Sequence, residues 1–140
     1  MKRLSKLAQS PVADCRLLVR AMILLPVFRL ALWLLPFWRL VIIMAGSRPR
    51  LFQASACQSE RIAWAIQLVS RYVPHATCLA QALTAKLLLE DAGIQANLHI
   101  GVAKTASGRF EAHAWVETQG RVITGGGELN RYSRLLRWES

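Results

Sequence analysis

Acidic residues and cysteines are scarce in this chain, and charged residues of any kind are few. Of its 140 residues, 19% are charged and 54% are hydrophobic, a balance that excludes a disordered or collagen-like chain. The length is that of one domain and excludes a multi-domain enzyme. The cysteines are Cys15, Cys57 and Cys78, an odd number with no pairing rhythm. We therefore expect no disulfide scaffold, and we expect the protein to be in the reducing cytoplasm.

The balance of charge is strongly basic. Eight acidic residues against eighteen lysines and arginines give a net charge of +10. No run has the basic–aromatic alternation of a single-strand groove or the basic helix of a DNA reader, so we expect no nucleic-acid partner. An acidic peptide or an anionic membrane surface fits the charge better. The basic residues gather near the two ends of the chain, at Lys2, Arg3, Lys6, Arg16 and Arg20 and then at Arg121, Arg131, Arg134 and Arg137.

Residues 17–45 form a long apolar stretch that is interrupted by three arginines and two prolines. Arg29 would lie near the centre of a membrane-spanning helix, at a cost of at least about 2.5 kcal/mol, which argues against a span. A signal peptide is a poor fit because the apolar region starts late. Pro26 and Pro36 should each end or kink a helix. We predict short helical pieces that pack on the second half, on a partner or on lipid headgroups, which leaves peripheral membrane contact open.

Two helices are predicted after a loop that begins at Gly46. The first covers about 59–70, with an apolar stripe that recurs at helical spacing. The second covers 78–91, with Thr77 as its N-cap and Gly93 closing its end. It leaves Cys78 in the first turn, where unpaired N–H groups and the helix dipole favour a thiolate and can hold an oxyanion.

A change to two-residue periodicity after Gly93 predicts strands. Alternation over 94–102 and 109–118, and a shorter run at 121–124, give an antiparallel meander with turns at 105–108 and 119–120. On the second strand, Ala112, Ala114 and Val116 take one face, while His113 and Trp115 take the other.

A cysteine on a helix and a histidine on a strand 35 residues later stand in the chain order of Cys–His hydrolases. His113, if it lies near Cys78, can take the thiol proton and return it to the leaving amine. A zinc site formed by these two residues with His75 and His99 is the weaker interpretation, because no second pair at metal-ligand spacing supports it. We expect neither a metal nor a cofactor.

Three short motifs stand in order within residues 58–126: TCLAQAL at 77–83, HIGV at 99–102 and EAHAWVE at 111–117. Together they resemble the stand-alone leader-peptidase half of the lasso peptide biosynthesis B proteins. That family belongs to the transglutaminase-like cysteine protease superfamily. The hydrophobic, arginine-punctuated front of the chain is similar to the same stand-alone form.

The resemblance implies an α+β fold, in which an N-terminal helical segment precedes a transglutaminase/papain-like core with a cysteine-bearing helix packed on an antiparallel sheet. The helical segment would cover 1–50 and the peptidase domain 51–140. The implied activity removes the leader of a ribosomally made lasso precursor, before a separate ATP-dependent cyclase closes the macrolactam. Carried over by position, Cys78 is the nucleophile and His113 the general base and acid.

The third catalytic position departs from the superfamily, which usually has an acidic residue on the strand after the histidine. This chain has RVITGGG there, at 121–127. A two-residue turn at 119–120 would pair residue 118 with 121 and 115 with 124, which puts Thr124 on the histidine face.

Our order of preference for the group that orients the imidazole is Thr124, then Glu128, with Glu117 or a backbone carbonyl behind them. A neutral orienter stabilises the imidazolium less than a carboxylate does, which predicts a slow or partner-dependent enzyme.

The chain has no evident module for gripping a leader peptide, so the resemblance implies a separate leader-recognition protein. The apolar 17–45 segment and the open strand edge of the meander are the docking surfaces that we expect. We expect a cytoplasmic protein, with a place at the inner face of the membrane left open. Two other functions also stay open: an amidase or acyl transferase that uses the same Cys–His pair, and a non-catalytic, membrane-associated peptide-binding module.

Overall fold

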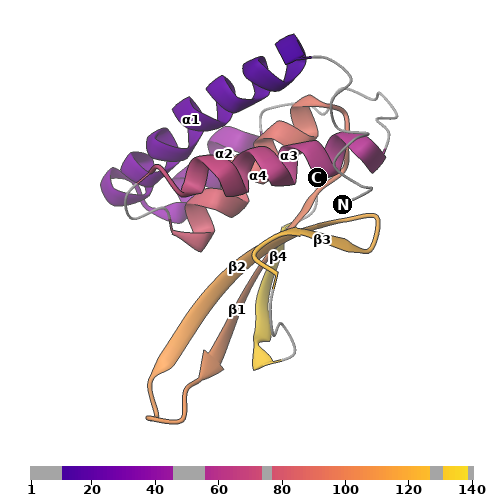
Figure 1. Cartoon of the computed structure of the whole chain (residues 1–140). Helices are drawn as coiled ribbons and strands as arrows, with labels where there is room; N and C mark the ends of the chain where they lie inside the picture. The colour runs from indigo at the N-terminus through magenta and orange to yellow at the C-terminus, as the bar shows by residue number, and fades with distance from the viewer. Residues whose placement is uncertain (1–10, 46–55, 74–76, 127–130, 139–140) are drawn as a thin grey trace.

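A computed structural model describes residues 11–45, 56–73, 77–126 and 131–138 of the chain, and it has the predicted α+β architecture. Helices form one layer and a four-stranded antiparallel sheet lies below them (Figure 1). The elements in chain order are α1 (Pro11–Leu34), α2 (Phe37–Ala45), α3 (Ala56–Ser70), α4 (Cys78–Asp91), β1 (Asn97–Lys104), β2 (Phe110–Thr118), β3 (Arg121–Thr124) and β4 (Ser133–Trp138).

Helix α1 continues through Pro26, so the prediction that a short helix ends at that proline is wrong. Pro26 lies on the exposed side of the helix, where the carbonyl that loses its hydrogen bond can be hydrated. On the other side, Leu25 and Phe28 are buried against α3 and α4, and this packing holds the helix together across the proline. Pro36 does separate two helices as predicted, because α2 starts at the next residue.

Helix α4 has the predicted bounds and both predicted caps. The side chain of Thr77 accepts a hydrogen bond from the N–H of Ala80 at 3.2 Å. At the other end Gly93 has a φ of 79°, and the N–H of Ile94 reaches back to the Leu89 carbonyl at 2.8 Å. This pairing is the Schellman pattern that a glycine after a helix end allows.

The hydrophobic core lies between the helices and one face of the sheet. Ala114 and Val116 of β2 and Leu98 of β1 belong to it, together with buried residues of α1, α3 and α4. Residues on both sides of the predicted domain boundary at residue 50 share this core, because Leu25 and Leu83 are both members.

The sheet has the order β3-β2-β1-β4, so β3 and β4 are its edges among the described residues. The strand β4 was not predicted. The turn between β2 and β3 has positive φ at both Gln119 and Gly120, and it pairs Thr118 with Arg121 as predicted.

Beyond this turn the predicted register of β3 is wrong, because Ile123 is an extra residue in a β-bulge. Thr124 pairs with Val116 instead of with Trp115. Cross-strand partners share a face, so Thr124 lies on the helix-facing side of the sheet and not with His113. The bulge lets both Ile123 and Thr124 turn toward the core, where Ile123 packs and Thr124 is buried.

The opposite face of the sheet carries aromatic and imidazole rings, which we call the aromatic face: His99, His113, Trp115 and Tyr132. Register places His99 beside Trp115 and Gly101 beside His113 on neighbouring strands. Trp115 is fully buried although it points away from the helices. The predicted separation of the β2 side chains into two faces is confirmed.

Candidate active site

The thiol of Cys78 lies at the first residue of α4, and it is free and half-buried. Thr77 caps the helix with its side chain, and its carbonyl accepts the N–H of Gln81 at 3.0 Å. The N–H groups of the first turn that lack intrahelical partners, together with the helix dipole, favour negative charge at this position. An oxyanion that forms beside the sulfur can therefore be held at the start of α4.

Helix α4 is held against the sheet by a buried ion pair as well as by apolar packing. Lys86 is completely buried, and its ammonium group donates to the carbonyl of Ala96 at 2.8 Å and lies 2.6 Å from the carboxylate of Glu90. The lysine thus ties the helix to the segment that leads into β1. A buried cation with two oxygen partners fixes the position of the helix that carries Cys78.

His113 is half-buried on β2 and has a hydrogen bond with a backbone carbonyl. Its Nε2 lies 2.6 Å from the carbonyl oxygen of Gly125. Because a carbonyl can only accept, Nε2 must carry a proton, and in the neutral ring Nδ1 is then the basic nitrogen. The tautomer follows from this bond, and it leaves Nδ1 for proton transfer.

The Gly125 carbonyl is aimed by a backbone conformation that favours glycine. Gly125 has a φ of 74°, and a Cβ placed on it would lie 2.5 Å from the carbonyl oxygen of Ala114 and 2.9 Å from Cβ of Trp115. Any side chain would therefore push this residue away from β2. The hydrogen bond to His113 depends on the close approach that only glycine permits here.

Two aromatic rings flank the imidazole of His113. The Trp115 centroid is 6.2 Å away with an interplanar angle of 22°, and the Tyr132 centroid is 5.1 Å away with an angle of 28°. Gly101, the cross-strand neighbour of His113, leaves the space for these rings. A Cβ on it would lie 2.9 Å from Cβ of Tyr132 and 3.1 Å from the Trp115 ring. The glycine of the HIGV motif thus allows Trp115 and Tyr132 to pack against the ring of His113.

Trp115 also takes part in a polar network with Glu117 and Arg134. The indole N–H donates to Glu117 Oε1 at 3.0 Å, and the Arg134 guanidinium lies 5.7 Å from the indole ring and 3.4 Å from the same carboxylate oxygen. His99 stacks on the indole at 5.4 Å. Glu117 is thereby engaged with Trp115 and Arg134.

His99 is almost completely buried, and this burial disfavours the charged form of its ring. Burial lowers the pKa of His99, while the Glu117 carboxylate, 3.3 Å from Nε2, opposes the shift. Arg134 and Arg137 add to the lowering. The His99 ring is part of the stack on the aromatic face.

Sequence reasoning missed Tyr132, Arg134 and the role of Gly125. The two-residue alternation along β2 predicts Trp115 and Glu117 on the same face as His113. This pattern is the sequence signal for the polar network around Trp115. Tyr132 and Arg134 gave no such signal, because their segment follows the glycine run and was not recognised as leading into a strand.

The predicted orienting groups have different outcomes. Thr124 is buried and lies on the other face from His113, and its hydroxyl has no hydrogen-bond partner among the described residues. The register that suggested its role is wrong, and the role itself is untested. Glu128 lies outside the described residues, as does His75. The backbone carbonyl, the last of the alternatives, is the group that bonds to His113. Across the described ranges no three His, Cys, Asp or Glu residues form a candidate metal site.

Cys78 and His113 come from elements that pack on each other, since α4 lies against β2. The half-buried Cys78 packs against the core between the layers, whereas the ring contacts of His113 are with Trp115 and Tyr132. Within the described part of the chain, the hydrogen bond of His113 goes to Gly125 and not to the thiol. By the alternation along β2, His113 lies on the face of the sheet opposite to the one that packs against α4, and no hydrogen bond joins the thiol and the imidazole within the described residues. A reactive Cys78–His113 pair therefore stays a prediction.

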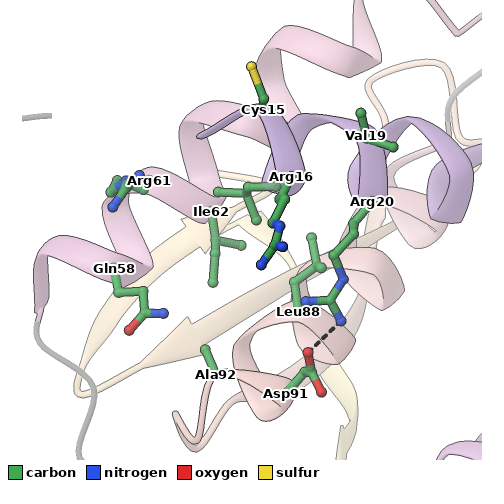
Figure 2. A pocket seen from close by; sticks show the side chains of 11 residues that line it. Cys15, Arg16, Val19, Arg20, Gln58, Arg61, Ile62, Leu88, Asp91 and Ala92 are labelled. Atoms are coloured by element: carbon green, nitrogen blue, oxygen red, sulfur yellow. Dashed lines mark hydrogen bonds and ion pairs between the residues drawn. The ribbon is translucent and has the colours of Figure 1, made fainter. Parts of the chain in front are cut away.

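A separate pocket of about 690 Å³ lies among α1, α3 and α4. Figure 2 shows Arg16 and Arg20 reaching into it from α1, with Arg20 paired to Asp91 of α4. Asp91 is the last residue of the helix that starts at Cys78, so this pocket lies about 20 Å along α4 from the thiol. The pocket is therefore not the site of the predicted chemistry.

Comparison with known proteins gives one family match. Residues 21–137 match the model of the transglutaminase-like superfamily, which spans most of the chain, from within α1 to within β4. Neither the comparison with curated proteins nor that with solved structures gives a match.

Proposed function

This chain belongs to the transglutaminase-like superfamily, whose members are generally cysteine-based enzymes, and on that premise we propose that it is a cysteine endopeptidase. Its substrate in this proposal is the precursor of a lasso peptide, from which it removes the leader. The observation that carries the proposal is a free thiol on the first residue of a capped helix, inside the family match. The lasso assignment rests on the three motifs of the sequence.

The proposed reaction has two steps. Nδ1 of His113 takes the proton from Cys78, and the thiolate attacks the scissile carbonyl, whose oxyanion faces the N–H groups at the start of α4. The C–N bond then breaks as His113 gives its proton to the leaving amine, and a thioester remains on sulfur. Water, deprotonated by His113, hydrolyses the thioester and releases the carboxylate together with the free thiol.

In this mechanism the Gly125 carbonyl orients the imidazole. It accepts the Nε2–H bond in both protonation states of the ring, and it carries a partial rather than a full negative charge. The imidazolium is thus stabilised less than it would be by a carboxylate, and we expect a slow enzyme or one that needs its partner.

The proposal includes partners that follow from the resemblance. A separate leader-recognition protein delivers the precursor, and an ATP-dependent cyclase uses the released core peptide. All three components would act in the cytoplasm.

The test is cleavage of a precursor peptide in the presence of its recognition protein, followed by mass spectrometry. We expect the wild type to release an intact leader, and Cys78→Ala to release none. Cys15→Ala is the matched control, because Cys15 is an exposed cysteine at the far end of the helical layer. Leader release by Cys78→Ala at the wild-type rate would contradict the proposal.

The same thioester can also be resolved by an amine, which is the second candidate function. The superfamily includes acyltransferases as well as proteases. Ammonia release from a glutamine side chain, or a crosslinked product with the leader still attached, would support this activity over the peptidase.

A further inference from the structure

The outer side of α1 and α2 exposes a row of large apolar side chains, which we call the outer stripe. Within α1 its members recur every three or four residues, so they lie along one side of that helix, and α2 adds two exposed apolar side chains. Each of them is at least half exposed: Val19, Met22, Ile23, Val27, Leu30, Trp33, Leu34, Trp38 and Ile42.

Helix α1 is therefore apolar on two sides, of which only one is covered. Ala21, Leu25 and Phe28 face the core and are at most 7% exposed. Trp33 on the outer stripe is 75% exposed and Ile23 is 58% exposed. An exposed apolar patch that is contiguous along a helix marks a surface that binds a membrane or another molecule.

The charged residues in the sequence around the outer stripe are all basic. Residues 15–59 contain no aspartate or glutamate, whereas arginines occur throughout this range. Arg39 is exposed on α2, with its guanidinium 5.4 Å from the Trp38 ring. Arg16 and Arg20 on α1 are also exposed, but they reach toward the pocket beside α4, where Arg20 pairs with Asp91. Exposed tryptophans with flanking arginines and no acidic residue match the headgroup region of an anionic bilayer.

The same structure argues for a helix that lies along the membrane instead of crossing it. The segment Cys15–Leu34 is long and apolar enough to span a bilayer by length and composition. Spanning would pull Leu25 and Phe28 out of the core and break the ion pair between Arg20 and Asp91 of α4. Contact through the outer stripe leaves both intact.

We propose that the outer stripe of α1 and α2 docks this protein on the surface of a bilayer that contains anionic lipid. The helix pair lies in the plane of the interface with its tryptophans at headgroup depth, and the sheet stays on the aqueous side. The inference does not depend on the proposed peptidase activity, because the residues of the outer stripe are remote in the fold from the aromatic face.

Co-sedimentation of the full-length protein with vesicles tests the proposal. We expect binding to phosphatidylcholine vesicles that contain phosphatidylglycerol, weaker binding to phosphatidylcholine alone, and release from the anionic vesicles at high salt. Equal partition into both vesicle types at all salt concentrations, or partition into neither, would overturn the proposal.

Serine substitutions at Ile23, Val27 and Trp33 should lower the partition coefficient by about tenfold or more, because three exposed apolar groups leave the interface. Phe110→Ser is the matched control, since Phe110 is 79% exposed on the sheet, and it should bind like the wild type. Circular dichroism and the thermal melting temperature verify that each variant is folded. A triple variant that is folded and binds undiminished would contradict the proposal.

Two further readouts separate the membrane from other occupants. The fluorescence that Ile23→Trp adds should be quenched more strongly by lipids brominated near the headgroup than by lipids brominated near the chain ends. A helix that spans from Cys15 to Leu34 would put residue 23 near the centre of the bilayer, where the deep label quenches most. Sedimentation velocity without lipid should give a monomer. A dimer that the triple variant abolishes, with no vesicle binding, would assign the outer stripe to a second copy of the chain and overturn the proposal.

Discussion

The two faces of the sheet are formed by alternating residues of the same strands, but they are stabilised differently. The helix-facing side is apolar, with Ala114 and Val116 in the core. The aromatic face buries Trp115 through ring stacking and a polar network. Because successive residues of β2 point to opposite faces, one strand contributes apolar side chains to the core and holds His113 in place on the other face.

The largest expected difference between the two faces comes from removing their most buried side chains. Trp115→Ala should lower the free energy of unfolding by about 3–5 kcal/mol, because a fully buried indole and its hydrogen bond are lost. Val116→Ala should cost about 2 kcal/mol, since it deletes two methyl groups from the core. Urea denaturation measures both. An equal or smaller effect at Trp115 would mean that the aromatic face is not a packed structure.

Substitution of Gly125 tests how the aromatic face holds its histidine. Gly125→Ala should cost about 1–2 kcal/mol from the positive φ alone, with a further cost from the clash against the Ala114 carbonyl. Single-turnover peptide cleavage should fall by about tenfold to a hundredfold because Nε2 loses its acceptor.

Gly120→Ala is the matched control for Gly125→Ala. Gly120 has the same φ of 74°, but a Cβ on it meets nothing within 4 Å. This variant should show the cost in stability without the loss of rate. Similar kinetics in the two variants would remove the Gly125 carbonyl from the mechanism.

Thr124 belongs to the other face, and its substitution should have a small effect. Within the part of the chain that the structure describes, its buried hydroxyl has no hydrogen-bond partner, so Thr124→Val should be neutral or stabilising by up to about 1 kcal/mol. We expect the single-turnover rate to change by less than about twofold, because the valine keeps the shape of the side chain. A large loss of rate would restore Thr124 as the orienting residue and show that the carbonyl is not sufficient.

The smallest expected effect is the dependence of stability on pH that His99 contributes. The lowered pKa means that the unfolded chain binds a proton at His99 more readily than the folded chain does. The free energy of unfolding should therefore decrease as the pH falls below about 6.5, the pKa of an unperturbed histidine. His99→Gln should flatten this slope between about pH 7.5 and 5.5. If the pH dependence of the free energy of unfolding is unchanged in His99→Gln, a residue other than His99 is responsible for it.

Much of the fold could be predicted from local patterns, and the departures have physical causes. The bounds and caps of α4 follow from Thr77 and Gly93, whose roles are local in sequence. The helix through Pro26 could not be predicted, because it depends on packing against α3 and α4 that lies far away in the chain. The β4 strand has adjacent leucines at 135–136 that break the alternation on which strand prediction relies.

The candidate site was only partly visible in the sequence. Cys78 at a helix start and His113 on a strand could be recognised from residue type and periodicity. The acceptor for His113 could not be assigned, because a single bulged residue, Ile123, shifts the register and replaces a side chain by the Gly125 carbonyl. Bulges depend on which residues the core accepts, and the alternation of a four-residue strand does not reveal them.

The rate of alkylation of Cys78 at neutral pH tests the central claim that His113 activates this thiol. Iodoacetamide labelling followed by peptide mass spectrometry gives the rate beside that of Cys15, an exposed thiol in the same chain. We predict that half-buried Cys78 reacts about tenfold or more faster than Cys15, and that His113→Ala removes the difference. A Cys78 that reacts more slowly than Cys15, at a rate unchanged in His113→Ala, would contradict the account.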